Sequence, residues 1–397
     1  MTARSLSLHV AIVAQTPFQY LSAILIRQAS GMKCDLWLID PSLKDYVDGC
    51  RNSELWERVE YLEVNKLAVG KYKLTDKIKR RYKIMAAIKR IKRYLMNTRP
   101  SAIVIFSDNH ELTAGFARLG KIVSSSHVVM AEDGAAVYLS FKRTQTILWK
   151  RIFAQLINAD NPNGYSIGWS PYIDSLLVSN PEVVHQDYVR DRKVFPYPAG
   201  PYPRSVMTEF IDMLNINLEE YIEYDRDIVL LGQPWAELGR MDSNQERKML
   251  QSLGDSKFSS RILIKPHPFE SINKYYGLGN IKVCSDELNR VPAEVVFELL
   301  HPSIVISIFS SAVFNYCLRN CKLGILLAFS SLPQEVTQFM KGKLSSYHAI
   351  TIVKDERELY EAIERISQES ANCDCNSLVE ANDDSWRSMV REALILS

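Results

Sequence analysis

Four short motifs carry side chains of the types that enzymes use to accept protons and to hold phosphate groups. In chain order they are Glu132-Asp133-Gly134, Lys265-Pro266-His267-Pro268, Pro292-Ala293-Glu294 and Ser310-Ser311. Each follows an apolar run typical of a buried parallel strand, and open α/β sheets bind ligands outside the carboxyl ends of their strands. We therefore expect the motifs to converge on one cleft, where one wall activates an acceptor hydroxyl and the other holds a nucleotide-linked donor.

The acidic pair Glu132 and Asp133 follows the expected strand 127–131. One carboxylate can take a proton from an acceptor hydroxyl, while the other orients the loop by accepting backbone N–H bonds. Gly134 permits a tight turn after them. A plain surface turn is the alternative interpretation, because Asp-Gly is a common turn dipeptide.

His267 stands between two prolines at the end of the expected strand 261–265. The prolines fix the backbone around it, so that the imidazole is held at the strand's carboxyl end. There it can bond a donor phosphate and, as imidazolium, protonate the phosphate as it leaves. Lys265 beside it is a second candidate for donor binding, and the alternative is a rigid turn with a solvated His.

Hydroxyls and a carboxylate in the second half complete the expected donor site. Ser310 and Ser311 open a helix, where free N–H groups and the helix dipole favour a phosphate; a plain Ser N-cap is the alternative. Glu294 follows Pro292 in a first helical turn and can accept both hydroxyls of a ribose. Helix-start chemistry, with Pro292 at the first helical position, explains the same pattern.

Two further residues are donor-binding candidates from their positions after strands. Gln19 lies in the segment 15–19, where Thr16 as N-cap and Pro17 explain the helix start but Gln19 is not required. Gly232 follows the strand 228–231. In the segment 107–111 we expect Asp108 or Asn109 to cap a helix. That segment has no clear Asp-x-Asp metal-diphosphate signature nearby, and no cluster of His, Cys or carboxylates in the chain has convincing metal-ligand spacing, so we predict no metal site.

Strands alternate with helical patterns along the chain, which predicts an α/β fold with parallel sheets. The expected strands are 8–14, 35–39, 102–106, 127–131 and 175–178, then 228–231, 261–265, 282–285, 304–308, 324–328 and 348–353. A proline-rich segment, 195–204, precedes the expected boundary. The predicted domains are 1–222 and 223–380, with a terminal helix in 381–397 that can cross back onto the first domain.

Composition narrows the class of protein only a little. The 397 residues suit two domains, and the net charge is +2. The seven cysteines are scattered and indicate reduced thiols in a cytoplasmic protein. No apolar run is long enough to span a bilayer, and we expect no signal peptide.

The segment 77–95 is an amphipathic helical pattern with a strongly cationic face. A run of like charges this long favours an anionic partner over a merely solvated surface. We expect an acidic glycan or the inner face of the cytoplasmic membrane, with peripheral association there, and no nucleic acid.

Together these motifs resemble the bacterial sialyltransferases. Glycosyltransferase families 38, 52 and 80 share an Asp/Glu-Asp/Glu-Gly motif, a His-Pro motif and a Ser or Ser-Ser motif, in this order. The opening residues 16–23 also resemble the family 52 and polysialyltransferase-like (family 38) group, and 230–234 resembles the first strand of their nucleotide domain. The resemblance implies the GT-B fold, in which two Rossmann-like domains face a central cleft.

The resemblance further implies an inverting, metal-independent transfer of sialic acid from CMP-sialic acid to a hydroxyl of a cell-surface glycan of capsule or lipooligosaccharide type. In it Glu132 would be the general base and Asp133 would support the loop. His267 would bind the CMP phosphate and act as general acid. The other implied contacts are the CMP phosphate for Ser310 and Ser311, and the ribose for Glu294. The donor is a substrate, so no cofactor is expected.

Two alternatives remain at this stage. The same fold and donor type can serve another CMP-linked ulosonic acid, of the Kdo or pseudaminic-acid kind. A non-catalytic module that binds anionic glycan through the basic helix is the other. Release of CMP from CMP-sialic acid separates an enzyme from such a module.

Overall fold

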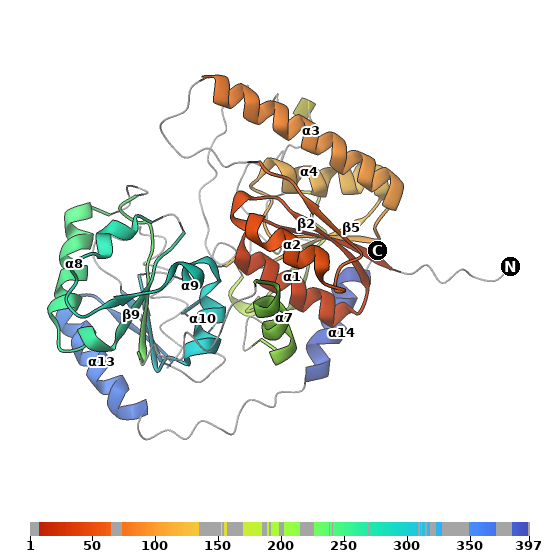
Figure 1. Ribbon diagram of the computed structural model, residues 1–397. Coiled ribbons are helices and arrows are strands. Elements are labelled where there is room, and N and C mark those ends of the chain that lie inside the picture. The colour runs from red at the N-terminus through yellow and green to blue at the C-terminus, as the bar shows by residue number, and fades with distance from the viewer. Residues whose placement is uncertain are drawn as a thin grey trace. The chain divides into compact units, whose positions relative to one another are not determined.

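A computed structural model describes the residues 8–64, 74–134, 152, 155–156, 170–184, 189, 192–197, 202–214, 226–237, 239, 241–268, 270–308, 310, 312–313, 316–317, 323–327, 349–370 and 383–395. The chain divides into two compact units, which Figure 1 draws as ribbons. The first unit contains Met1–Pro198, Arg204–Asn215 and Asn382–Ser397, and the second contains Ala199–Pro203 and Ile216–Ala381. Each unit is built on one parallel sheet, so the predicted α/β class is confirmed.

The first unit has a seven-stranded sheet in the order β3-β2-β1-β4-β5-β6-β7, and every neighbouring pair is parallel. Its strands are almost continuously apolar because helices cover both faces. They are β1 His9–Ala14, β2 Lys33–Leu38, β3 Arg58–Tyr61, β4 Ala102–Ile105, β5 His127–Ala131, β6 Ser175–Val178 and β7 Lys193–Pro196.

The helices of the first unit lie in two layers: α1, α2, α7 and α14 on one face of the sheet, and α3 and α4 on the other (Figure 1). The α-helices are α1 Pro17–Ser30, α2 Val47–Asn52, α3 Leu74–Thr98, α4 Glu111–Leu119, α7 Arg204–Leu214 and α14 Asp383–Ile395. The short turns are η1 Pro41–Tyr46, η2 Gly120–Ser124 and η4 Pro181–Val183.

Local chemistry sets the ends of α1 as the sequence predicts. Thr16 is the N-cap, and its hydroxyl accepts the N–H of Gln19 at 3.2 Å. Gly31 ends the helix with a φ of 64°, a left-handed conformation that glycine adopts without strain. The C-terminal helix α14 packs against α1, and the Nε of Arg391 donates to the carbonyl of Ser30 at 3.1 Å.

The second unit has a six-stranded parallel sheet in the order β10-β9-β8-β11-β12-β13. Its strands are β8 Ile228–Leu231, β9 Ile262–Lys265, β10 Lys282–Val283, β11 Ile304–Ser307, β12 Leu323–Leu327 and β13 Ile350–Val353. Its helices and turns are α8 Ser243–Asp255, η6 Ser259–Arg261, η7 Ile272–Tyr275, α9 Asp286–Arg290, α10 Ala293–Leu300 and α13 Glu356–Ser370. Among the described residues, none of the helices combines the length and the apolar character that crossing a membrane requires.

Candidate active site

Glu132 directly follows β5 and is buried, with 1% of its surface exposed. Its backbone N–H donates to the carbonyl of Leu177 at 2.9 Å, and its Oε2 accepts the N–H of Ser179 at 2.6 Å. The carboxylate is therefore held against the end of the neighbouring strand β6. Asp133 and Gly134 are half-buried, and the φ of 82° at Gly134 gives the tight turn that the sequence predicts.

Glu132 has a structural contact besides the role of base that the resemblance implies. It accepts a backbone N–H from a residue 47 positions along the chain. One oxygen of Glu132 thus has a structural role. The same bond fixes the direction of the carboxylate, which a positioned general base requires.

Gln19 is buried at the carboxyl end of β1, with 1% of its surface exposed. Its Oε1 accepts the N–H of Gln15 at 2.7 Å, and the Nε2 of Gln15 donates to Thr113 at 3.3 Å. The side-chain oxygen of Gln19 therefore holds the loop between β1 and α1. Its Nε2 is buried with no hydrogen-bond partner among the residues that the structure describes. Gln19 belongs to the first unit, whereas the predicted phosphate-binding residues belong to the second.

The expected cap of the helix after β4 was wrong. The helix α4 begins at Glu111, and its N-cap is His110, whose Nδ1 accepts the N–H of Leu112 at 3.2 Å. Asp108 is fully buried, and its Oδ2 accepts the N–H of Ser170 at 2.7 Å. Its partner lies 62 positions along the chain, so no local pattern could reveal this role.

His267 lies just beyond β9, the strand labelled in Figure 1, and is half-buried. Its backbone N–H donates to Oε2 of Glu270 at 2.6 Å. Burial, together with the nearby charges of Lys265 and Lys274, lowers the pKa of His267 to about 4. The imidazole is therefore neutral at neutral pH.

Lys265 is the last residue of β9 and is buried, with 6% of its surface exposed. Its Nζ donates to the carbonyl of Asn289 at 3.3 Å. Burial lowers its pKa, while the nearby ionisable groups of Cys284 and Glu294 act in the opposite direction. Lys265 is thus electrostatically coupled to both Glu294 and His267 at the carboxyl edge of this sheet.

A charged network holds the loop that carries His267. Oε2 of Glu270 accepts both the N–H of His267 and, at 2.8 Å, the hydroxyl of Tyr275. The Nζ of Lys274 lies 2.5 Å from Glu270 and 2.9 Å from Glu246. The sequence interpretation missed Glu270, although the Glu-to-Lys spacing of four residues to Lys274 was a signal for an ion pair.

Three carboxylates of this network, those of Glu237, Glu246 and Glu270, have oxygens within 4.8 Å of one another. Lys274 lies among them, at 3.5 Å from the carboxylate of Glu237 and closer to the other two. Its ammonium group pairs with all three carboxylates and offsets part of their charge, and we assign no metal to this cluster.

Gly232 acts through the same network. A Cβ at this position would lie 2.2 Å from Oε2 of Glu270 and 2.3 Å from the hydroxyl of Tyr275. The missing side chain lets the two groups pack against the end of β8. The structure therefore gives Gly232 a positioning role beside the loop of His267, whereas the sequence suggested only donor binding.

The remaining predicted residues lie on the next loops of the second unit. Glu294 is the second residue of α10 and is half-buried; Pro292 is the N-cap rather than the first helical residue that the sequence predicts. The hydroxyl of Ser310 accepts the N–H of Ala312 at 3.3 Å, as an N-cap does. Ser311 lies outside the described residues.

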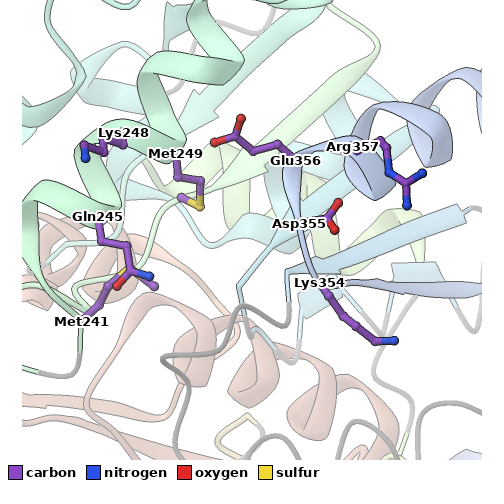
Figure 2. A pocket seen from close by; sticks show the side chains of 8 residues that line it. All are labelled: Met241, Gln245, Lys248, Met249, Lys354, Asp355, Glu356 and Arg357. Carbon is purple, nitrogen blue, oxygen red and sulfur yellow. The ribbon is translucent and has the colours of Figure 1, made fainter.

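A surface hollow of about 600 Å³ lies between the first turns of α8 and α13 in the second unit (Figure 2). Met241, Lys248, Lys354 and Glu356 are among the residues that line it. None of the predicted site residues contributes to its wall. We therefore place no part of the donor site in this hollow.

Solved structures with the same architecture identify the fold. The Arabidopsis thaliana protein UGT89C1 in complex with UDP has 10% identity over 97% of this chain and 99% of that chain, with a TM-score of 0.59. The UDP-GlcNAc 2-epimerase of Methanocaldococcus jannaschii, in complex with UDP-GlcNAc and UDP, has 14% identity over 97% and 99%, with a TM-score of 0.55. These likenesses show the fold alone, and the predicted GT-B fold is confirmed.

The comparison with family models defines the class of enzyme more closely than the fold does. Residues 51–325 match the model of the alpha-2,8-polysialyltransferase (POLYST) family, and this chain belongs to that family. The protein is therefore a glycosyltransferase of the sialyltransferase type, as the motifs predicted. The matched segment includes Glu132, His267, Glu294 and Ser310 but not Gln19. A search of curated proteins found no match.

Proposed function

We propose that the protein is an inverting, metal-independent sialyltransferase that moves sialic acid from CMP-sialic acid to a hydroxyl of a cell-surface glycan. The family supports sialyl transfer from a nucleotide sugar to a glycan. The observation that carries the finer proposal is the loop after β9. It combines His267, the buried cation of Lys265 and the carboxylate of Glu270, which fixes the backbone of His267.

On the donor side, His267 and Lys265 hold the phosphate of CMP. A nearby anion favours the charged form of an imidazole, so the bound donor raises the pKa of His267 from its low value in the free protein. Ser310 and Ser311 add hydroxyl contacts to the phosphate, and Glu294 accepts the ribose hydroxyls. His267, Lys265 and the two serines act on the negative charge that develops on the phosphate, and no step of the proposal uses a divalent ion.

In the transfer step, the bond between the anomeric carbon and the phosphate oxygen breaks, and His267 gives its proton to that oxygen. The acceptor hydroxyl forms the new bond to the anomeric carbon and loses its proton to Glu132. Ser179 orients this carboxylate through its N–H, and Asp133 supports the turn. Attack from the face opposite to the leaving CMP inverts the configuration.

The acceptor that we propose is a bacterial capsule polysaccharide or lipooligosaccharide, including polyanionic chains. The helix α3 supports this proposal through its cations and serves as the site of an anionic partner. We place the enzyme in the cytoplasm. The described cysteines Cys34, Cys50, Cys284 and Cys317 are buried free thiols, which suits a reducing compartment.

A donor screen tests the proposal. The purified protein is incubated in excess EDTA with CMP-sialic acid, CMP-Kdo or a CMP-pseudaminic acid, and CMP release and glycan products are measured. We expect sialylated product and CMP from CMP-sialic acid. Product only from another donor, or none before Mg²⁺ or Mn²⁺ is added, would overturn the donor or the metal-independent mechanism respectively.

A further inference from the structure

The helix α3 has a second apolar face besides the one that packs in the first unit. Its inner face contacts α4 and η2 (Figure 1), and the buried residues there include Ile84, Ile91 and Leu95. The exposed large apolar residues on the same helix are Ile78 at 58%, Tyr82 at 75%, Met85 at 38% and Met96 at 55%. Such side chains are normally scattered singly over a surface.

The exposed apolar residues share one side of the helix. Ile78, Tyr82 and Met85 are spaced by four and three residues, which stacks their side chains along one line. Met96 follows Met85 after eleven residues, about three helical turns. The positions between them on the same line are cationic, namely Lys89, Lys92 and Arg93. These seven residues form what we name the outer face of α3.

The cations of the outer face are not compensated within the described part of the chain. Lys89, Lys92 and Arg93 are exposed and make no ion pair with a described residue. By contrast, Arg80 forms a bidentate ion pair with Glu111, with both hydrogen bonds at 2.9 Å, and Arg90 forms an ion pair with Glu60. The two paired arginines tie α3 to other elements of the first unit, and we do not count them in the outer face.

We propose that the outer face of α3 docks on a lipid bilayer that contains anionic lipid. The range Leu74–Thr98 contains nine basic residues and one acidic residue, which matches a negative surface. A soluble polyanion would use the cations but would leave Ile78, Met85 and Met96 in water. A bilayer interface accommodates both the cations and the apolar side chains. The apolar side chains enter the acyl boundary, Lys and Arg reach the headgroups, and Tyr82 lies between these two layers.

The inference deepens the anionic partner proposed for α3 and rests on it, but it does not require transfer activity. A 25-residue helix is about 38 Å long, so it can lie along the membrane plane with all of its outer face in contact. Docking would bring the enzyme to acceptors that are attached to lipid.

Vesicle sedimentation of the full-length protein tests the inference. The vesicles contain phosphatidylcholine alone or with phosphatidylglycerol. One variant combines Ile78→Ser, Met85→Ser and Met96→Ser, and a second combines Lys89→Gln with Lys92→Gln. The matched control combines Lys79→Gln with Lys83→Gln, which removes the same charge from exposed lysines away from the outer face. Far-UV circular dichroism and thermal unfolding establish that each variant is folded.

We expect binding only when phosphatidylglycerol is present. The affinity of the serine variant and of the Lys89/Lys92 variant for these vesicles should each fall by about tenfold or more relative to the wild type. The affinity of the control variant should fall by clearly less. Undiminished binding by the serine variant, or equal losses in the two lysine variants, would overturn the inference. If the protein binds a soluble anionic polysaccharide but no vesicles, the proposal of a lipid surface is wrong, and the proposal of an anionic partner for α3 is retained. If it binds neither, both proposals fall.

Discussion

In the proposed mechanism, the ionisation of His267 depends on the bound donor. Burial and the neighbouring cations Lys265 and Lys274 keep its imidazole neutral in the free protein, because they lower its pKa to about 4. A group that must donate a proton to the leaving CMP needs a much higher pKa. The phosphate itself supplies the opposite charge that raises it.

Binding of CMP should therefore be accompanied by proton uptake at His267. At a pH of about 6, above the pKa in the free protein and below that expected in the complex, the wild type should take up more protons than His267→Gln. Calorimetry in buffers with different ionisation enthalpies measures this number. Equal uptake by the two proteins would show that His267 does not meet the phosphate.

The bond between Glu132 and Ser179 separates the structural role of Glu132 from its chemical one. Glu132→Gln keeps a side-chain oxygen for the buried N–H of Ser179, whereas Glu132→Ala leaves that donor unpaired. We expect the alanine variant to lose about 1–3 kcal/mol in the free energy of unfolding relative to the glutamine variant. Urea unfolding measures the difference, and equal stabilities would show that the bond contributes nothing.

At the scale of elements, contacts beyond the strands hold the loops that carry the candidate site residues. The loop after β9 depends on Glu270 and Tyr275 within the same connection, and a side chain at position 232, at the end of β8, would collide with both. The position of His267 therefore depends on several segments of the chain in addition to its two flanking prolines.

Gly232→Ala should displace the network and weaken CMP binding about tenfold, because overpacking forces the neighbouring groups to move. Gly239→Ala, in the same connection between β8 and α8, is the control. Its φ of 66° strains an alanine, but its Cβ meets no atom within 4 Å. The NMR signals of His267 should shift in the first variant alone. Unchanged CMP affinity and unchanged His267 signals in Gly232→Ala would contradict the positioning role.

The sequence predicted the elements well where the pattern was local. The helix expected at 77–95 is observed as Leu74–Thr98, and the strand expected at 8–14 as His9–Ala14. Apolar periodicity and the usual caps are sufficient for such elements. The partners of Asp108 and Glu270 were missed because one bond crosses 62 positions and the other joins a side chain to a backbone N–H.

At the scale of the whole molecule, the fold limits the class of reaction but does not identify the reaction. A UDP-GlcNAc 2-epimerase and UGT89C1 both share this architecture with the chain at low identity. The family match adds sialyl transfer, and the residues at the strand ends support the mechanism that we propose. In that proposed mechanism, Glu132 of the first unit would be the base, and His267 of the second unit would bind the phosphate with the other nucleotide contacts.

His267→Ala should weaken both donor binding and turnover, because one side chain contacts the phosphate in the ground state and in the transition state. We expect a higher KM for CMP-sialic acid and a lower kcat in steady-state transfer assays. A variant with wild-type values of both constants would remove His267 from the mechanism.

The most direct test of this division of roles is to measure transfer and CMP affinity together in Glu132→Gln. The variant keeps the acceptor for Ser179 and every nucleotide contact of the second unit, but it cannot take the proton from the acceptor hydroxyl. The account predicts unchanged CMP affinity and a transfer rate lower by about a hundredfold or more. A transfer rate near that of the wild type, in a folded variant that binds CMP normally, would contradict it.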